Sequence, residues 1–204
     1  MTVSSPTRPR VEGEREDEIL DACVELVIEL GYDRLTMDAV AKRARASKAT
    51  LYRRWTSKPQ LVVDALARSK RSPELHDVDT GSLRGDLLAT YCGPGGMTER
   101  DNVQMLAVVM TALHTDPEFA TEFRERFLAP KIEVNLRIYA RAAQRGELSP
   151  HVDPALVGPA LAGILLHRSF LLSEQVTTST IQQVVDQIIL PAATGRPYSP
   201  EDNA

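Results

Sequence analysis

Apolar residues recur at helical spacing along most of the chain, and no long segment alternates apolar with polar residues. The pattern therefore predicts an all-α protein. Glycine, proline and helix-capping residues divide the chain into about nine helices. Their expected ranges are 14–30, 36–43, 47–55, 58–69, 83–91, 99–114, 117–144, 154–172 and 180–193.

The third expected helix is short and has two different faces. Ser47 stands at its start, where a side-chain oxygen can accept a backbone N–H hydrogen bond, and Thr36 has the same place in the preceding helix. At about 100° per residue, Leu51 and Trp55 share the inner face. The opposite face carries Ala49, Thr50, Tyr52 and Arg53. The turn Ala44-Arg45-Ala46 joins the two helices, which predicts a helix-turn-helix, whose second helix enters the DNA major groove.

Charged residues are distributed unevenly along the chain. The 204 residues include 24 basic and 28 acidic side chains, a net charge of −4. Residues 1–33 carry 3 basic and 9 acidic residues, and residues 72–204 carry 10 and 17, whereas residues 34–71 carry 11 and 2. The resulting +9 around the expected helix-turn-helix indicates a polyanionic partner. From charge alone, a solvated basic face remains an alternative.

Motifs for catalysis or for a structural metal are missing from the sequence. The four histidines have no metal-ligand spacing, and no zinc-protease, nucleophile-elbow or dinucleotide motif occurs. Cys23 and Cys92 are too few for a disulfide framework or a zinc site. We therefore expect no catalytic residues, no metal and no cofactor. The apolar stretch 155–166 is shorter than a membrane span and the amino end lacks a secretory signal, so we expect a cytoplasmic protein with no membrane partner.

Residues 36–58 resemble the DNA-binding signature of the TetR family of transcriptional regulators. That pattern has a Thr opening the second helix, an Ile/Val-Ala pair, a turn ending in Ser, and Lys-x-x-Leu-Tyr-x-x-Phe followed by Ser-Lys. This chain matches it with Thr36, Val40-Ala41, Ala44, Ser47, Lys48, Leu51-Tyr52 and Ser57-Lys58. It departs from it at Trp55, where Phe is usual, and at Arg45, where the family has Gly. If Arg45 requires a positive φ, a residue other than glycine costs roughly 1–2 kcal/mol there.

The resemblance also implies which residues face DNA. They are Thr36, Arg45, Ser47, Lys48, Ala49, Thr50, Tyr52, Arg53 and Lys58. We assign Thr36, Lys48, Tyr52 and Lys58 mainly to phosphates, and Ala49, Thr50 and Arg53 mainly to bases. For Arg45, a phosphate contact and a slightly different turn are alternatives. Arg54 lies on the flank, where a surface or ion-pair role is an alternative. Arg8 and Arg10 could reach a minor groove, although a disordered arm is the simpler interpretation.

The rest of the chain predicts a second domain. We expect a disordered arm at 1–13, a DNA-binding domain at 14–71, an effector-binding and dimerisation domain at 72–195 and a loose tail at 196–204. The helix expected over 154–172 is apolar on nearly all sides, more than one core face requires. With the last helix it is expected to contact a second copy, through Leu161, Ile164, Leu165, Val184, Val185 and Ile188. The alternative is that both are core helices of a monomer.

As in TetR-like regulators, the intervening helices would surround a small-molecule effector. The candidate lining residues are Met105, Met110, His114, Phe123, Phe127, Tyr139, His167 and Phe170, each with ordinary core packing as the alternative. The resemblance thus predicts a homodimeric repressor that binds a palindromic double-stranded DNA operator and is released by the effector. The alternative is a ligand-independent DNA-binding regulator, whose C-terminal domain only dimerises or binds a protein partner.

Overall fold

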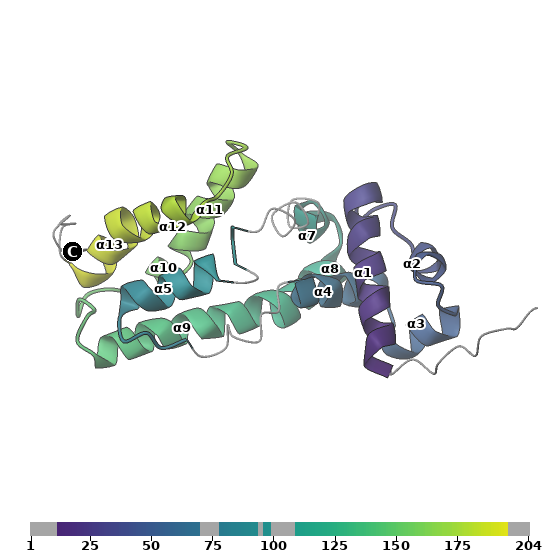
Figure 1. Ribbon diagram of the computed structural model, residues 1–204, viewed down its shortest axis with the longest axis horizontal. Coiled ribbons are helices and arrows are strands. Elements are labelled where there is room, and N and C mark those ends of the chain that lie inside the picture. Colours follow the sequence, from purple (N-terminus) through teal and green to yellow (C-terminus); the bar gives the residue numbers. More distant parts are fainter. Residues whose placement is uncertain (1–11, 70–77, 94–95, 99–108, 196–204) are drawn as a thin grey trace, which may run out of the picture.

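The computed structural model describes residues 12–69, 78–93, 96–98 and 109–195, and every regular element in these ranges is a helix. Figure 1 shows two groups of helices connected by one long helical run. Helices α1 to α4 form one group, α5 and α10 to α13 form the other, and the run from α8 to α9 extends between them. The predicted all-α fold class is therefore confirmed. Most of the arm expected at 1–13, and the tail expected at 196–204, lie outside the described residues.

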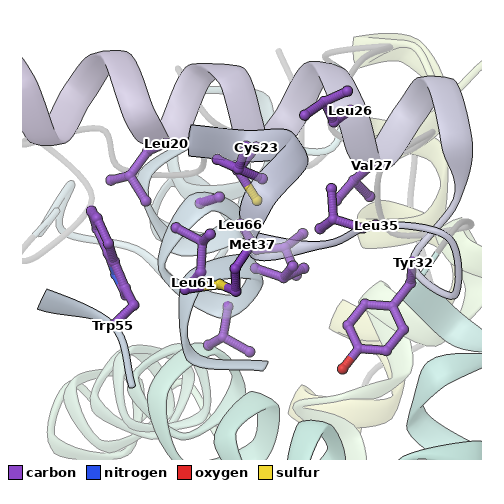
Figure 2. Packing of buried hydrophobic residues seen from close by; sticks show 14 of the residues in the cluster. Leu20, Cys23, Leu26, Val27, Tyr32, Leu35, Met37, Trp55, Leu61 and Leu66 are labelled. Carbon is purple, nitrogen blue, oxygen red and sulfur yellow. The ribbon is translucent and has the colours of Figure 1, made fainter. Parts of the chain in front are cut away.

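The first group is built around α1 (Glu12–Leu30), which packs against α2 (Met37–Arg43) and α4 (Lys58–Ser69). The predicted apolar stripe of α1 is largely buried, and Figure 2 shows Cys23 and Val27 pointing from α1 toward Met37 and Leu61. This first core, formed mainly by α1 to α4, also includes Phe119 and other residues of the long run. The first group of helices and the long run therefore share buried apolar side chains.

The long run consists of α8 (Pro117–Glu122), the π-helix η2 (Phe123–Leu128) and α9 (Ala129–Gln144). It is preceded by α7 (Ala112–Thr115), and the predicted helix at 117–144 is confirmed as one continuous helical segment. The π-helix ends two residues before Pro130. A proline inside a helix lacks the N–H donor and crowds the carbonyl four residues earlier, so a wider turn accommodates it.

The second group contains α5 (Leu83–Cys92), α10 (Pro154–Val157), α11 (Ala160–Phe170), α12 (Thr178–Val184), the π-helix η3 (Val185–Ile189) and α13 (Leu190–Thr194). With α9, these helices enclose a second core of apolar residues, which includes Ile138, Leu161 and Val185. The helix expected over 154–172 is interrupted at Gly158 and Pro159. None of the helices in the described part of the chain is long and apolar enough to cross a lipid bilayer.

Candidate nucleic-acid interface

The geometry of α3 (Lys48–Arg54) agrees with the two faces predicted for it. The Ser47 hydroxyl accepts the N–H of Thr50 at 3.1 Å and caps the helix. Leu51 is fully buried and Trp55, directly after the helix, is 2% exposed. Ala49, Tyr52 and Arg53 are exposed, with 49% of the Tyr52 surface accessible, and Thr50 is half-buried. The first core therefore holds one side of α3 and leaves the other side to solvent.

The preceding helix, α2, places a second set of polar groups beside α3. The Thr36 hydroxyl caps α2 by accepting the N–H of Ala39 at 3.1 Å. Lys48 Nζ lies 2.6 Å from Asp38 Oδ2, and both side chains are largely exposed. The hydrogen bond that Lys48 donates to Asp38 raises the pKa of Lys48, so its ammonium group stays charged. A DNA phosphate at this position would compete with Asp38 for Lys48.

The turn between α2 and α3 contains a left-handed residue. Arg45 has φ of +52°, a conformation that costs roughly 1–2 kcal/mol for a residue with a Cβ. Its carbonyl oxygen accepts a hydrogen bond from Arg15 of α1, which also pairs with Glu18. The Arg45 side chain is exposed. Arg45 therefore has the positive φ at which a residue other than glycine is costly.

Acidic residues of α1 neutralise part of the basic segment, which charge counting along the chain did not predict. Their partners are arginines of α2, α3 and α4, all between 2.6 and 3.1 Å: Arg43 with Glu25 and Glu29, Arg54 with Glu16, and Arg68 with Asp17 and Asp21. The ion pair of Arg54 with Glu16 agrees with the ion-pair role given above as an alternative for Arg54. Four further basic side chains of α2, α3 and the turn between them are exposed: Lys42, Arg45, Lys48, which pairs with Asp38, and Arg53.

Lys58, expected at a phosphate, lies at the boundary between the two groups of helices. Its Nζ donates to the carbonyl of Tyr32 at 3.2 Å and stands 4.1 Å from the centroid of the Tyr32 ring. The Tyr32 hydroxyl donates to Asp116 Oδ2 at 2.6 Å, and its ring packs 4.7 Å from that of Phe119. Burial, followed by the hydrogen bond to Asp116, raises the pKa of Tyr32 above its ordinary value. A phosphate contact by Lys58 stays a prediction.

A second polar connection joins the end of α3 to the long run. Trp55 Nε1 donates a 2.9 Å hydrogen bond to Asp64 Oδ2 on α4. The other oxygen of Asp64 accepts from Arg126 Nη2 of η2 at 2.6 Å. Arg126 also pairs with Glu122, which in turn accepts a 3.3 Å hydrogen bond from Gln60 on α4. These contacts connect the residue that follows α3 with α4 and the π-helix η2.

The residues expected to line an effector pocket are dispersed in the structure. Phe123 and Phe127 belong to the first core and Tyr139 to the second. Phe170 is half-buried against the first core, whereas Met110, His114 and His167 are exposed. Met105 lies outside the described residues. Their helices place the described members in two cores and on the surface, and an effector site lined by them stays a prediction.

The residues expected at a dimer interface differ in exposure within the single chain, and their contact with a partner stays a prediction. Leu161, Leu165, Val184 and Val185 are buried in the second core of a single chain. Ile164 is half-buried, and Ile188 is 47% exposed. Large apolar side chains on the surface of the neighbouring segments include Leu156 of α10 and Leu171, directly after α11, each 74% exposed. The apolar pattern predicted that these helices are apolar on many sides. It did not predict which side faces the core and which faces solvent.

The cysteines and the metal-binding residue types add no further site. Burial raises the pKa of Cys23 to about 12, so its thiol is protonated and unreactive near neutral pH. Burial also raises the pKa of Cys92. Within the described residues, no three or more His, Cys, Asp or Glu side chains are grouped so that they could hold a metal ion.

Two family models match the chain and cover most of it. The model described as "Bacterial regulatory proteins, tetR family" matches residues 19–65, which include α2 and α3. The model described as "Tetracyclin repressor-like, C-terminal domain" matches residues 77–188. The first match contains the helix-turn-helix, and the second contains the long run and most of the second group of helices.

Individual proteins are similar over nearly the whole chain. An HTH-type transcriptional regulator of Mycobacterium tuberculosis is 35% identical over 192 residues, 93% of each chain. A "DNA-binding transcriptional repressor TetR" of Mycobacteroides abscessus is 33% identical and covers 86% of this chain and 92% of its own. The crystal structure of the TetR family transcription regulator SCO0332 is 29% identical, with a TM-score of 0.68 over 86% of this chain and 97% of that one.

Proposed function

Because the chain belongs to the TetR family of transcriptional regulators, we propose that it is a homodimeric repressor that binds a palindromic operator through α2 and α3. The observation that carries this proposal is the outer face of α3, where Ala49, Tyr52 and Arg53 are exposed while Leu51 and Trp55 are held in the core. A small residue, a phenol and an arginine on a short helix suit contacts to base edges and phosphates. The exposed Lys48 and Arg45 add positive charge at the rim of this face.

A second copy is needed because one short helix reads only a few base pairs. Dimeric helix-turn-helix proteins place two reading helices about 34–36 Å apart, one turn of DNA. The exposed apolar residues of the C-terminal helices support this part of the proposal: Leu156 and Leu171 at 74% and Ile188 at 47%. Gly163 lies on the same segment, and a Cβ added there would meet no atom within 4 Å. An open, small residue of this kind lets a helix of the partner approach closely.

Release by a small molecule is supported by the contacts that join the two domains, proposed at 14–71 and 72–195. The hydrogen bonds from Arg126 to Asp64 and from Tyr32 to Asp116 connect the reading domain with the long run. A molecule that binds the second domain and shifts η2 or α8 would thereby change the spacing of the two reading helices. Operator binding would place the protein in the cytoplasm with the chromosome.

Selection of bound sequences from a random double-stranded DNA pool tests this function. We expect enrichment of a palindrome whose half-sites are about one helical turn apart. Full-length protein with Arg53 replaced by Ala serves as the matched control and should enrich a less defined motif. Enrichment of a non-palindromic site would contradict the dimeric arrangement, and failure to enrich any sequence at low salt would contradict operator binding. If the second domain only mediates dimerisation, no compound in a small-molecule screen should release the protein from DNA.

A further inference from the structure

Three uncharged polar side chains lie together at the edge of the second core, remote from the reading helix. Tyr91 comes from α5, and Asn135 and Tyr139 come from successive turns of α9, which packs along α5 (Figure 1). Asn135 Nδ2 donates a 3.2 Å hydrogen bond to the hydroxyl of Tyr91. Side chains four residues apart share one face of a helix, so Asn135 and Tyr139 are neighbours.

Two atoms of this group are buried without a hydrogen-bond partner in the described part of the chain. They are Asn135 Oδ1 and the hydroxyl oxygen of Tyr139, a residue with no exposed surface. If the amide of Asn135 were turned over, its nitrogen rather than its oxygen would lack the partner. Folded proteins satisfy nearly all buried polar groups, and an unsatisfied one is costly. A pair of unsatisfied groups on one helix face is therefore a feature that a bound molecule would explain.

The neighbouring backbone leaves space for the amide. Gly158, at the interruption between α10 and α11, lies so close that an added Cβ would be 2.5 Å from Asn135 Oδ1. The polar group thus reaches from α5 and α9 toward the start of α11. The second core beside it includes the apolar Ile138 and Ala142 of α9. The buried carboxylates of these helices, Asp86 and Asp186, are paired with arginines.

The group carries no charge and is not suited to accept one. Burial raises the pKa of Tyr91 to about 12 and also raises the pKa of Tyr139, so both phenols are neutral. An ionised ligand placed against these three side chains would lose its hydration and gain no counter-charge from them. A neutral ligand that both donates and accepts a hydrogen bond would satisfy Asn135 Oδ1 and use the hydroxyl proton of Tyr139.

We propose that Tyr91, Asn135 and Tyr139 form the polar end of the effector site and select a neutral, largely apolar molecule carrying a hydroxyl or a primary amide. This inference rests on the proposed function, because it names the chemical class of the effector. Of the pocket residues expected from sequence, it retains Tyr139. It adds Asn135 and Tyr91, which the apolar pattern did not single out because polar residues on an amphipathic helix are usually assigned to solvent.

Calorimetric titration of the full-length protein without DNA tests the chemical class. The probes are three aromatic series of increasing size, based on benzene, naphthalene and biphenyl, each with the hydrocarbon, the hydroxyl, the primary amide and the carboxylate. In at least one series we expect the hydroxyl or amide compound to bind at least tenfold more tightly than the hydrocarbon and the carboxylate. Equal binding of the hydrocarbon, tighter binding of the carboxylate, or no binding in all three series would overturn the proposal.

The variant Tyr139→Phe tests the site. It should reduce the preference for the hydroxyl probe over the hydrocarbon at least fivefold, while the melting temperature of the ligand-free protein stays the same or rises, because an unsatisfied hydroxyl has been removed. Asn135→Leu should reduce the same preference. The control Thr56→Val removes an exposed hydroxyl after α3, which hydrogen-bonds Gln60, and should leave probe affinity unchanged. An undiminished preference in Tyr139→Phe, or a lower melting temperature, would overturn the proposal.

A parallel titration with the operator duplex distinguishes this inference from the proposed function. A hydroxyl probe that depends on Tyr139 but does not displace DNA would support the site and contradict effector release. A carboxylate or a cation that displaces DNA, without any effect of Tyr139→Phe, would support effector release and overturn the site.

Discussion

Asp64 holds the indole nitrogen of Trp55 with one carboxylate oxygen, at 2.9 Å, and Arg126 of the second domain with the other, at 2.6 Å. Trp55 is the single tryptophan of the chain and lies directly after the reading helix. The bulkier indole, which replaces the usual Phe of the family signature, thus gains a donor that a phenyl ring lacks. Because Trp55 and Arg126 both donate to Asp64, this carboxylate connects the end of α3 with η2.

The first prediction concerns this pair. Asp64→Ala should lower the free energy of unfolding by about 1–3 kcal/mol, because the buried indole N–H loses its acceptor. Asp64→Asn, whose amide oxygen can still accept that hydrogen bond, should retain most of the stability. Urea denaturation followed by Trp55 fluorescence measures both. If the two variants are equally destabilised, the indole hydrogen bond is not the important contact.

Local chemistry predicted much of the fold. Helical periodicity and capping hydroxyls identified α2 and α3, and Thr36 and Ser47 accept the expected backbone N–H groups three residues later. These interactions depend on residues within one turn, so the sequence alone contains them. The faces of α3 followed from the same short-range geometry.

Contacts between distant segments could not be predicted in this way. The ion pairs of α1 with Arg43, Arg54 and Arg68 join residues 14 to 51 positions apart, and they cancel charge that the sequence count left positive. Likewise, the apolar pattern over 154–172 could not separate Leu161, buried in its own chain, from Leu156 and Leu171 on the surface. Both distinctions depend on how whole helices pack.

The second prediction uses the ion pair of Lys48 with Asp38. Asp38→Asn should strengthen operator binding, because Lys48 would no longer be held 2.6 Å from a carboxylate and a negative charge near the phosphates would be lost. Lys48→Ala should weaken binding to all sequences alike and flatten the dependence of log K on log salt by about one unit. Binding measured at several salt concentrations tests both. Weaker binding by Asp38→Asn would contradict a phosphate contact of Lys48.

The third prediction separates base reading from phosphate binding. Arg53→Ala should reduce the discrimination between the operator and a duplex with one altered base pair by roughly 1–3 kcal/mol, because arginine makes directional contacts to guanine. Lys48→Ala serves as the matched control, in which affinity falls but discrimination persists. Competition titrations with single-substitution duplexes provide the measurement. Unchanged discrimination in Arg53→Ala would indicate that Arg53 contacts DNA phosphates and not bases.

The fourth prediction concerns Arg45, with φ of +52°. Arg45→Gly relieves roughly 1–2 kcal/mol of backbone strain, against an entropic cost of about 0.4–1 kcal/mol in the unfolded chain. The free energy of unfolding should therefore rise by about 0.5 kcal/mol. Arg45→Ala keeps the strain and should show no such gain. Both variants should weaken DNA binding equally if the guanidinium of Arg45 contacts a phosphate. An equal free energy of unfolding in the two variants would argue against backbone strain at this turn.

The last prediction concerns the surface proposed to pair two copies. Gly163 is exposed on α11, and an added Cβ would meet no atom of its own chain within 4 Å. Gly163→Arg should therefore leave the fold of each chain intact but place a long charged side chain where the partner helix would approach. We expect light scattering to show a monomer, circular dichroism to show undiminished helix content, and operator affinity to fall. Gly163→Ala, the control, adds one methyl group and should favour the helix by roughly 1 kcal/mol when that surface is free. A Gly163→Arg protein that remains dimeric would show that the two copies associate through another surface, and the exposed Leu156, Leu171 and Ile188 would then need a different partner.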